Sequence, residues 1–148
     1  MSTSSTSGYS GKPLPAKLGY QLGDSVLLIN GPGWFEDMLR KAGVSVVKDV
    51  PATWVHGFLT DKQKLSIWLK VNDLNKIAKG AWFSWPKKAS GLTTNVKEQT
   101  FRDLILPMGW VDTKVCVVDN NWSGLKFFCV AVSKVLLSKF QLATRLLI

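Results

Sequence analysis

The stretch KVCVVDNNWSGLKFF, residues 114–128, decides how the rest of the chain folds. It consists of two apolar runs separated by a polar turn that contains asparagine, tryptophan and glycine. Asparagine and glycine suit tight turns, because they tolerate the backbone angles that a sharp reversal requires. The stretch therefore predicts two consecutive strands, residues 111–118 and 125–132, that pair as an antiparallel hairpin.

Upstream of this hairpin the sequence alternates between strand and helix patterns. Short apolar runs bounded by turn residues predict strands, and apolar residues at helical spacing predict helices. The predicted strands are residues 24–30, 44–47, 54–59 and 81–85, and the predicted helices are residues 34–41, 62–79 and 95–106. Such an alternation indicates a three-layer, Rossmann-like α/β fold. Its sheet is expected to be mostly parallel, with about six strands, helices on both faces and one antiparallel edge strand.

The ends of the predicted elements carry recognisable capping residues. Thr60 or Asp61 is the expected N-cap of the second helix, and Asn95 is the expected N-cap of the third. Residues 9–19 are rich in proline and glycine, which predicts an irregular segment anchored by Tyr9, Leu14 and Leu18.

The length of 148 residues predicts one domain. We expect residues 1–18 to form a disordered or extended arm, residues 19–132 the α/β domain, and residues 133–148 an amphipathic helix or tail. Apolar residues of that last segment fall at helical spacing, namely Leu136, Phe140, Ala143 and Leu147. It either packs on the domain or, as a cationic amphipathic segment, binds a membrane or a partner.

The net charge of +9 favours an anionic partner, such as nucleic acid or a phosphate-bearing ligand, although it equally serves solubility. The sequence contains no apolar run long enough to span a membrane and no signal peptide at its polar start, so a cytoplasmic location is expected. Cys116 and Cys129 lie on the two arms of the hairpin, where they could face each other as reduced thiols. The oligomeric state is not predicted.

Three blocks of the chain carry a family resemblance: YSGKPLPAKLG at residues 9–19, WFSWPKKASG at residues 82–91, and GWVDTKVCVVDNNWSGLKF at residues 109–127. With these blocks the chain resembles a family of small bacterial proteins catalogued as a domain of unknown function. The resemblance implies a compact α/β domain and no particular activity. Members of that family usually finish soon after the last strand with a short basic tail, whereas residues 128–148 here are longer and apolar. More loosely, the strand order is similar to the later part of class I methyltransferases.

Candidate ligand-binding residues follow from the expected topology. In open α/β sheets, ligands bind outside the carboxyl ends of the parallel strands. The turns at those ends are the stretches richest in tryptophan, glycine and polar side chains. They supply the candidate site residues Asn30, Gly31, Gly33, Trp85, Lys87, Lys88, Asp119, Trp122 and Ser123.

Each group of candidates has a second interpretation. Gly31 and Gly33 allow a phosphate to approach the start of a helix, but the third glycine of a nucleotide-binding loop is missing, which favours a plain tight turn. Lys87 and Lys88 beside Trp85 suit a phosphate or a stacked base, or they form a solvated loop. The turn that holds Asp119, Trp122 and Ser123 is also explained by conformation alone, with Trp122 folded back over the hairpin.

No catalytic or metal-binding set is recognisable in the sequence. His56 is the only histidine, and its apolar and aromatic neighbours indicate a partly buried, satisfied side chain rather than a general base. The sequence therefore predicts a non-catalytic binding or interaction domain for an anionic ligand or a protein partner. The alternatives are a small methyltransferase-like or nucleotide-binding enzyme, with S-adenosylmethionine or a nucleotide as a weakly supported cofactor, and a basic nucleic-acid-binding protein.

Overall fold

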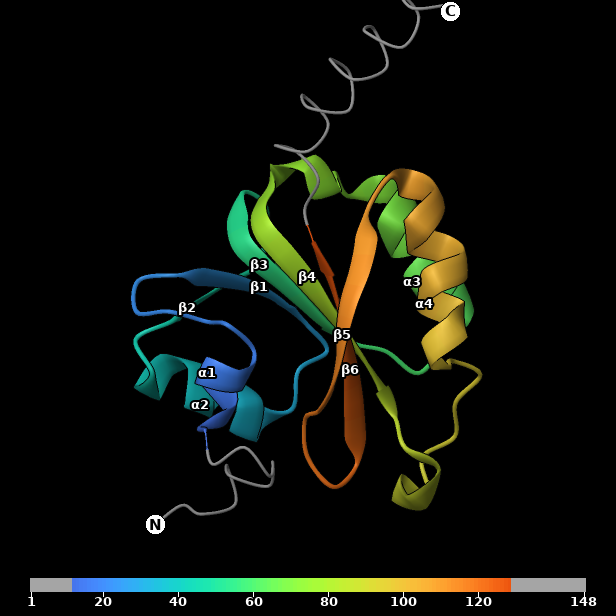
Figure 1. The fold of residues 1–148 in the computed structure, drawn as a ribbon, viewed down its shortest axis with the longest axis horizontal. Coiled ribbons are helices and arrows are strands. Elements are labelled where there is room, and N and C mark those ends of the chain that lie inside the picture. Colours follow the sequence, from blue (N-terminus) through green and yellow to red (C-terminus); the bar gives the residue numbers. More distant parts are fainter. Residues whose placement is uncertain (1–11, 129–148) are drawn as a thin grey trace, which may run out of the picture.

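The strands form one sheet in the order β2-β1-β3-β4-β6-β5, as Figure 1 shows for the computed structural model, which describes residues 12–128. The strands are β1 (Ser25–Ile29), β2 (Ser45–Val47), β3 (Ala52–Phe58), β4 (Ile77–Pro86), β5 (Val111–Val117) and β6 (Trp122–Phe128). The first four strands run parallel to one another, and β6 runs antiparallel to both β4 and β5. This confirms the mostly parallel Rossmann-like α/β fold.

The position of the antiparallel strand differs from the prediction of an antiparallel edge. β6 lies between β4 and β5, whereas β5, the strand at the edge, runs in the same direction as β4. The hairpin turn inserts the second arm next to β4, so the first arm becomes the edge of the sheet. Leu125 and Phe127 of β6 are consequently buried in the core.

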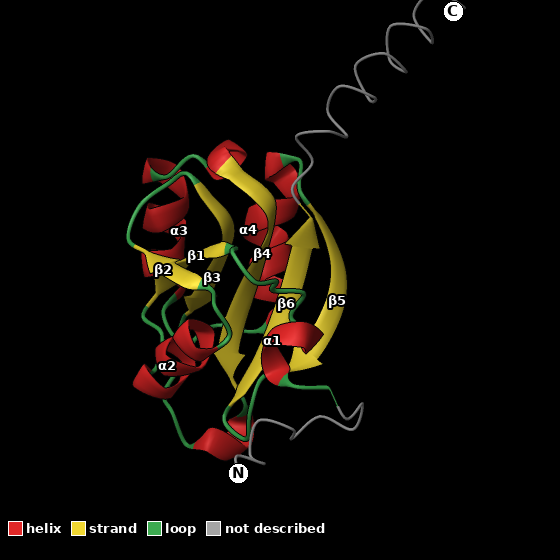
Figure 2. Ribbon diagram, turned by 90° about the vertical axis from the view of Figure 1, so that its left-hand side faces the viewer, coloured by secondary structure: helices red, strands yellow, loops and turns green. Residues whose placement is uncertain are grey.

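Helices cover both faces of the sheet (Figure 2). The helix α2 (Gly33–Lys41) and the single turn α1 (Leu14–Lys17) lie on one face, and α3 (Lys62–Val71) and α4 (Glu98–Ile105) lie on the other. Side chains of α2 pack with Trp54, Phe58 and Trp82, while side chains of α3 and α4 pack with Val55, Phe83 and Phe127. We refer to these two surfaces as the α1/α2 face and the α3/α4 face.

The helix predicted for residues 62–79 is too long. α3 ends at Val71, one 3₁₀ turn (Leu74–Lys76) follows, and β4 begins at Ile77. Asp73 accepts a hydrogen bond from the backbone N–H of Asn75 at 2.9 Å, which shows how short polar side chains compete with helical backbone bonds. The expected cap at the start of α3 is confirmed, because Asp61 Oδ1 accepts from the N–H of Gln63 at 2.9 Å.

Two other local predictions were wrong. Asn95 does not cap α4, which begins at Glu98; its Oδ1 instead accepts from the N–H of Lys62, at the start of α3, at 2.7 Å. The segment of residues 9–19 contains the helical turn α1, and its described apolar anchors Leu14 and Leu18 are buried.

Cys116 does not lie opposite Cys129 in the observed register. It pairs with Gly124 across the hairpin, and its thiol is buried and free. Cys129, like the segment predicted as residues 133–148, lies outside the described residues.

Candidate functional site

The loops that follow β4 and β5 meet at one edge of the sheet. Pro86 pairs with Trp122, and the backbone N–H of Lys87 donates to the carbonyl of Asn121 at 2.8 Å. Because β1 and β3 run parallel to β4, residues 30–33 and 59–61 lie at the same edge. We refer to this rim as the carboxyl edge. The sequence-based juxtaposition of residues 86–88 with residues 120–124 is therefore observed.

The two tryptophans proposed for this edge do not converge. Trp85 pairs with Ser123 and contacts Phe101 of α4 on the α3/α4 face, with ring centres 5.6 Å apart. Trp122 lies on the α1/α2 face, with its ring centre 5.1 Å from that of Phe58. Successive side chains of a strand point to opposite faces, so the sheet itself separates the two indoles.

Asp119 and its turn are explained by local conformation. Asp119 Oδ1 accepts hydrogen bonds from the backbone N–H groups of Asn121 and Trp122, both at 2.8 Å. Such a carboxylate shapes the turn between β5 and β6, in the way that aspartate commonly does in turns. Its main role here is structural.

The glycine turn after β1 is followed at once by two aromatic side chains of α2, Trp34 and Phe35. A Cβ atom on Gly31 would lie 2.5 Å from the side chain of Leu28, which would have to move to admit any other residue there. Phe35, one residue before the position of the missing third glycine, is fully buried, with its ring centre 4.7 Å from that of His56 and 4.9 Å from that of Phe58. Trp34 stays 42% exposed beside it. Asn30 adopts a positive φ of 55°, and a Cβ atom on Gly33 would meet no atom within 4 Å. The missing third glycine favours a plain turn over a cofactor loop.

Lys87 and Lys88 are the charged candidates that remain available at the carboxyl edge. Lys88 is exposed and opens the 3₁₀ turn Lys88–Ser90, and Lys87 is half-buried where the two loops join. Within residues 12–128, neither ammonium forms an ion pair with a carboxylate. Their charges are therefore not neutralised by a carboxylate within that range.

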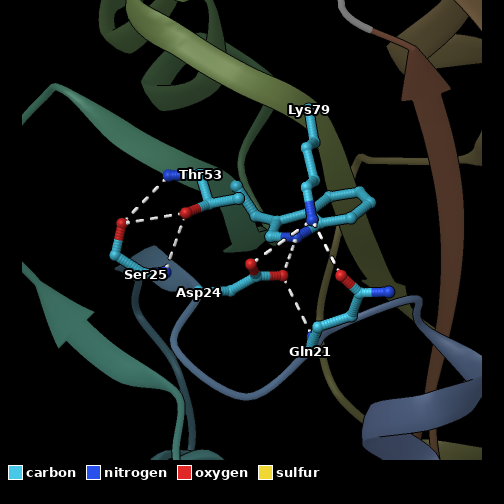
Figure 3. A network of polar contacts seen from close by, with 6 residues as sticks. Gln21, Asp24, Ser25, Thr53 and Lys79 are labelled. Atoms are coloured by element: carbon cyan, nitrogen blue, oxygen red, sulfur yellow. Dashed lines mark hydrogen bonds and ion pairs between the residues drawn. The ribbon is translucent and has the colours of Figure 1, made fainter.

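A second polar region, which sequence reasoning missed, holds residues 18–24 against the α1/α2 face. We name this stretch the anchored segment. Asp24, only 8% exposed, accepts from the Gln21 N–H at 3.0 Å and from Trp54 Nε1 at 2.9 Å, and it lies 3.4 Å from Lys79 Nζ (Figure 3). Burial by itself raises the pKa of this carboxyl, but these hydrogen bonds and the Lys79 charge bring the pKa below its usual value. At the far end of the segment, Trp82 Nε1 donates to the Leu18 carbonyl at 2.8 Å.

His56 lies beneath the anchored segment and is fully buried. Its Nδ1 is 2.8 Å from the Tyr20 hydroxyl and its Nε2 is 2.8 Å from the Ser84 hydroxyl, so either neutral tautomer is satisfied. Burial lowers the pKa of the imidazole to about 3. The prediction of a satisfied histidine is confirmed, and its burial is complete rather than partial.

Together these features define a Rossmann-like α/β domain whose carboxyl edge carries two lysines, Lys87 and Lys88, without an ion-pair partner in residues 12–128. Among residues 12–128, no three histidine, cysteine or acidic side chains are grouped so that they could hold a metal ion, and no helix has the length and apolar character needed to cross a membrane.

Comparison with known proteins adds little beyond the fold. No family model and no curated protein matches the chain, so the family resemblance stays a prediction. Among solved structures, the chain is similar to a SAM-dependent methyltransferase from Aquifex aeolicus, with 14% identity and a TM-score of 0.49 over 78% of this chain and 87% of that one. A similarity of this size says nothing about the activity of this chain.

Proposed function

We propose that this chain is a non-catalytic, Rossmann-like binding domain that recognises an anionic ligand or partner at the carboxyl edge, with Lys87 and Lys88 as the main contacts. The observation that carries the proposal is the pair of ammonium groups at the junction of two loops, without a carboxylate partner in the described part of the chain. Carboxyl ends of parallel strands are where ligands of open α/β sheets bind.

Several observations support a binding role over catalysis. The described side chains best suited to proton transfer or nucleophilic attack are buried or engaged: His56 and Cys116 are shielded from solvent, and Asp119 holds its own turn. The third glycine of a nucleotide-binding loop is missing after Gly31 and Gly33, which disfavours the methyltransferase-like alternative.

The proposal is tested by ligand titration of the full chain. Thermal shift and calorimetry with pyrophosphate, ATP, GTP and S-adenosylmethionine should give a stabilising response to at least one phosphate-bearing compound. The double variant Lys87→Gln/Lys88→Gln should lose that response. The matched control Lys41→Gln/Lys70→Gln, which removes two exposed lysines near the ends of α2 and α3, should keep it.

Two outcomes would contradict the proposal. One is the absence of any response to these compounds together with the absence of a protein partner in pull-downs; the other is an equal loss in both double variants. The nucleic-acid alternative is separated by salt: affinity for DNA or RNA should fall by about one log unit per log unit of salt for each phosphate that the protein neutralises.

A further inference from the structure

The outer side of β5 is an unpaired strand edge within the described residues. β5 is the last strand of the sheet, and only its inner neighbour β6 pairs with it. The N–H of Val118, which follows β5, donates to the Trp122 carbonyl at 3.0 Å. Backbone groups of alternate residues point to the same neighbour in an antiparallel pair, so those of Val115 and Val117 point outward. Lys17 Nζ, 3.3 Å from the Val117 carbonyl, approaches from that open side.

The two sides of this edge differ in chemistry. On the α3/α4 face, Val115 and Val117 are 50% and 37% exposed. On the α1/α2 face, Lys114 pairs directly with Lys126, and further along the edge Lys17 of α1 contacts the Val117 carbonyl. An incoming strand would therefore meet apolar side chains on one face and ammonium groups on the other.

The charge of the α1/α2 side is not neutralised by nearby described acids. Asp112 of β5 is engaged by Arg102 of α4 on the opposite face, at 2.9 Å. Lys126 Nζ lies 5.2 Å from the ring centre of Trp54 and 5.4 Å from that of Phe128, so it is held by cation–π contacts. Burial, together with the charge of Lys114, lowers the pKa of Lys126. An anionic partner would relieve the repulsion between these two lysines.

We propose that the outer edge of β5 binds an extended segment of a partner protein in which acidic and apolar residues alternate. The segment adds a strand to the sheet through the backbone groups of Val115 and Val117, with its apolar side chains on these valines and its carboxylates towards Lys17 and Lys114. Binding displaces Lys17 Nζ from the Val117 carbonyl and frees that ammonium for a carboxylate. This surface is separate from the carboxyl-edge site, so either proposal stands without the other.

A second copy of the chain is a poorer occupant of the same edge. Pairing of two β5 strands about a twofold axis would bring their lysine-bearing sides together, and like charges across strands are destabilising. The irregular register between Asp112 and Lys114 and the presence of Lys114 itself are features that protect natural sheet edges from self-pairing. A partner with carboxylates turns the same lysines into favourable contacts.

The test uses the full chain and a fluorescein-labelled peptide of alternating valine and glutamate, followed by fluorescence anisotropy. We expect saturable binding that weakens as salt is added. Replacement of the glutamates by lysines, or methylation of alternate backbone nitrogens of the peptide, should abolish it. These two peptides leave the protein unchanged, so they report on charge and on backbone pairing independently of any folding defect.

Protein variants locate the binding to β5. Lys114→Glu should weaken binding about tenfold, and Val115→Pro about fivefold, because proline removes an outward N–H that β6 does not use. Lys41→Glu should change nothing, and circular dichroism checks that each variant is folded. The proposal is overturned if the glutamate peptide does not bind, if the lysine or N-methylated peptide binds as well, or if sedimentation shows that the edge is used for self-association.

Discussion

The anchored segment and the carboxyl edge both combine charged residues and turns with tryptophans on nearby strands, but the polar groups are used differently. In the anchored segment the polar groups satisfy one another: Asp24 bonds Trp54, and Trp82 bonds the Leu18 carbonyl. At the carboxyl edge, Lys87 and Lys88 have no carboxylate partner among the described residues. The difference teaches that buried, mutually satisfied polar groups maintain this fold, whereas exposed and unmatched charges are available for recognition.

The largest expected difference in stability is between Trp82, which holds the anchored segment, and Trp34 at the carboxyl edge. Trp82→Ala should lower the free energy of unfolding by about 3–5 kcal/mol, because it removes a fully buried indole and its hydrogen bond to the Leu18 carbonyl. Trp34→Ala, at the half-exposed position of the carboxyl edge, should cost less than about 1 kcal/mol. Urea unfolding followed by circular dichroism measures both, and equal losses would break the comparison.

The next effect is a pH dependence that originates beneath the anchored segment. The pKa of His56 is about 3 in the folded chain against 6.5 for an ordinary histidine, so on acidification the unfolded chain binds a proton that the folded chain excludes. Stability should therefore fall as pH drops from 6.5 towards 3, by about 2 kcal/mol between pH 7 and pH 5. Urea unfolding at several pH values measures this, with His56→Gln as the comparison. Parallel pH profiles for the two proteins would show that His56 is not the source.

A smaller difference in stability is expected between the variants Asp24→Asn and Asp119→Asn. Asp24→Asn should cost about 1 kcal/mol, because the amide keeps one acceptor for Trp54 and Gln21 but loses the ion pair with Lys79, whose side chain is 44% exposed. Asp119→Asn preserves the acceptor of an exposed turn and should cost less than about 0.5 kcal/mol. Chemical denaturation at neutral pH measures both values, and a larger loss for Asp119 would show that its half-buried carboxylate matters more for stability than that of Asp24.

The smallest expected effect on stability belongs to the proposed ligand site. Lys87→Gln/Lys88→Gln should change the free energy of unfolding by less than about 0.5 kcal/mol, because neither lysine forms an ion pair in the described part of the chain. The same variant is expected to lose ligand binding. A loss of stability comparable to that of Trp82→Ala would assign these lysines to the fold instead.

Local patterns were sufficient for most elements of the fold. The apolar run in β1 and the turn residues between β5 and β6 indicated strands, and alternation with helices indicated a parallel-dominated sheet. The end of α3 was missed, because apolar spacing continues past Asn72 while Asp73 diverts the backbone into a 3₁₀ turn. Asn95 was assigned to the wrong helix, because its partner Lys62 lies 33 residues away in the sequence.

For the candidate site, too, local patterns predicted part of the arrangement and missed the part that depends on strand pairing. Strand ends and turn composition placed Lys87 and Lys88 at the edge where ligands of such folds bind, and the structure brings their loop against Asn121. The separation of Trp85 from Trp122 follows from the pairing register between β4 and β6, in which adjacent side chains alternate between faces. The sequence carries no local signal for that register.

By itself, the sequence determined the order of strands and helices and the basic, tryptophan-rich character of the turns, because these depend on neighbouring residues. Only the tertiary structure decided which polar groups are paired with one another inside the protein. Asp24 meets Trp54 and Lys79, and His56 meets Tyr20 and Ser84, across long stretches of chain. Burial and hydrogen-bond satisfaction arise from contacts between distant segments. They distinguish the side chains that stabilise the fold from those that we propose for ligand binding.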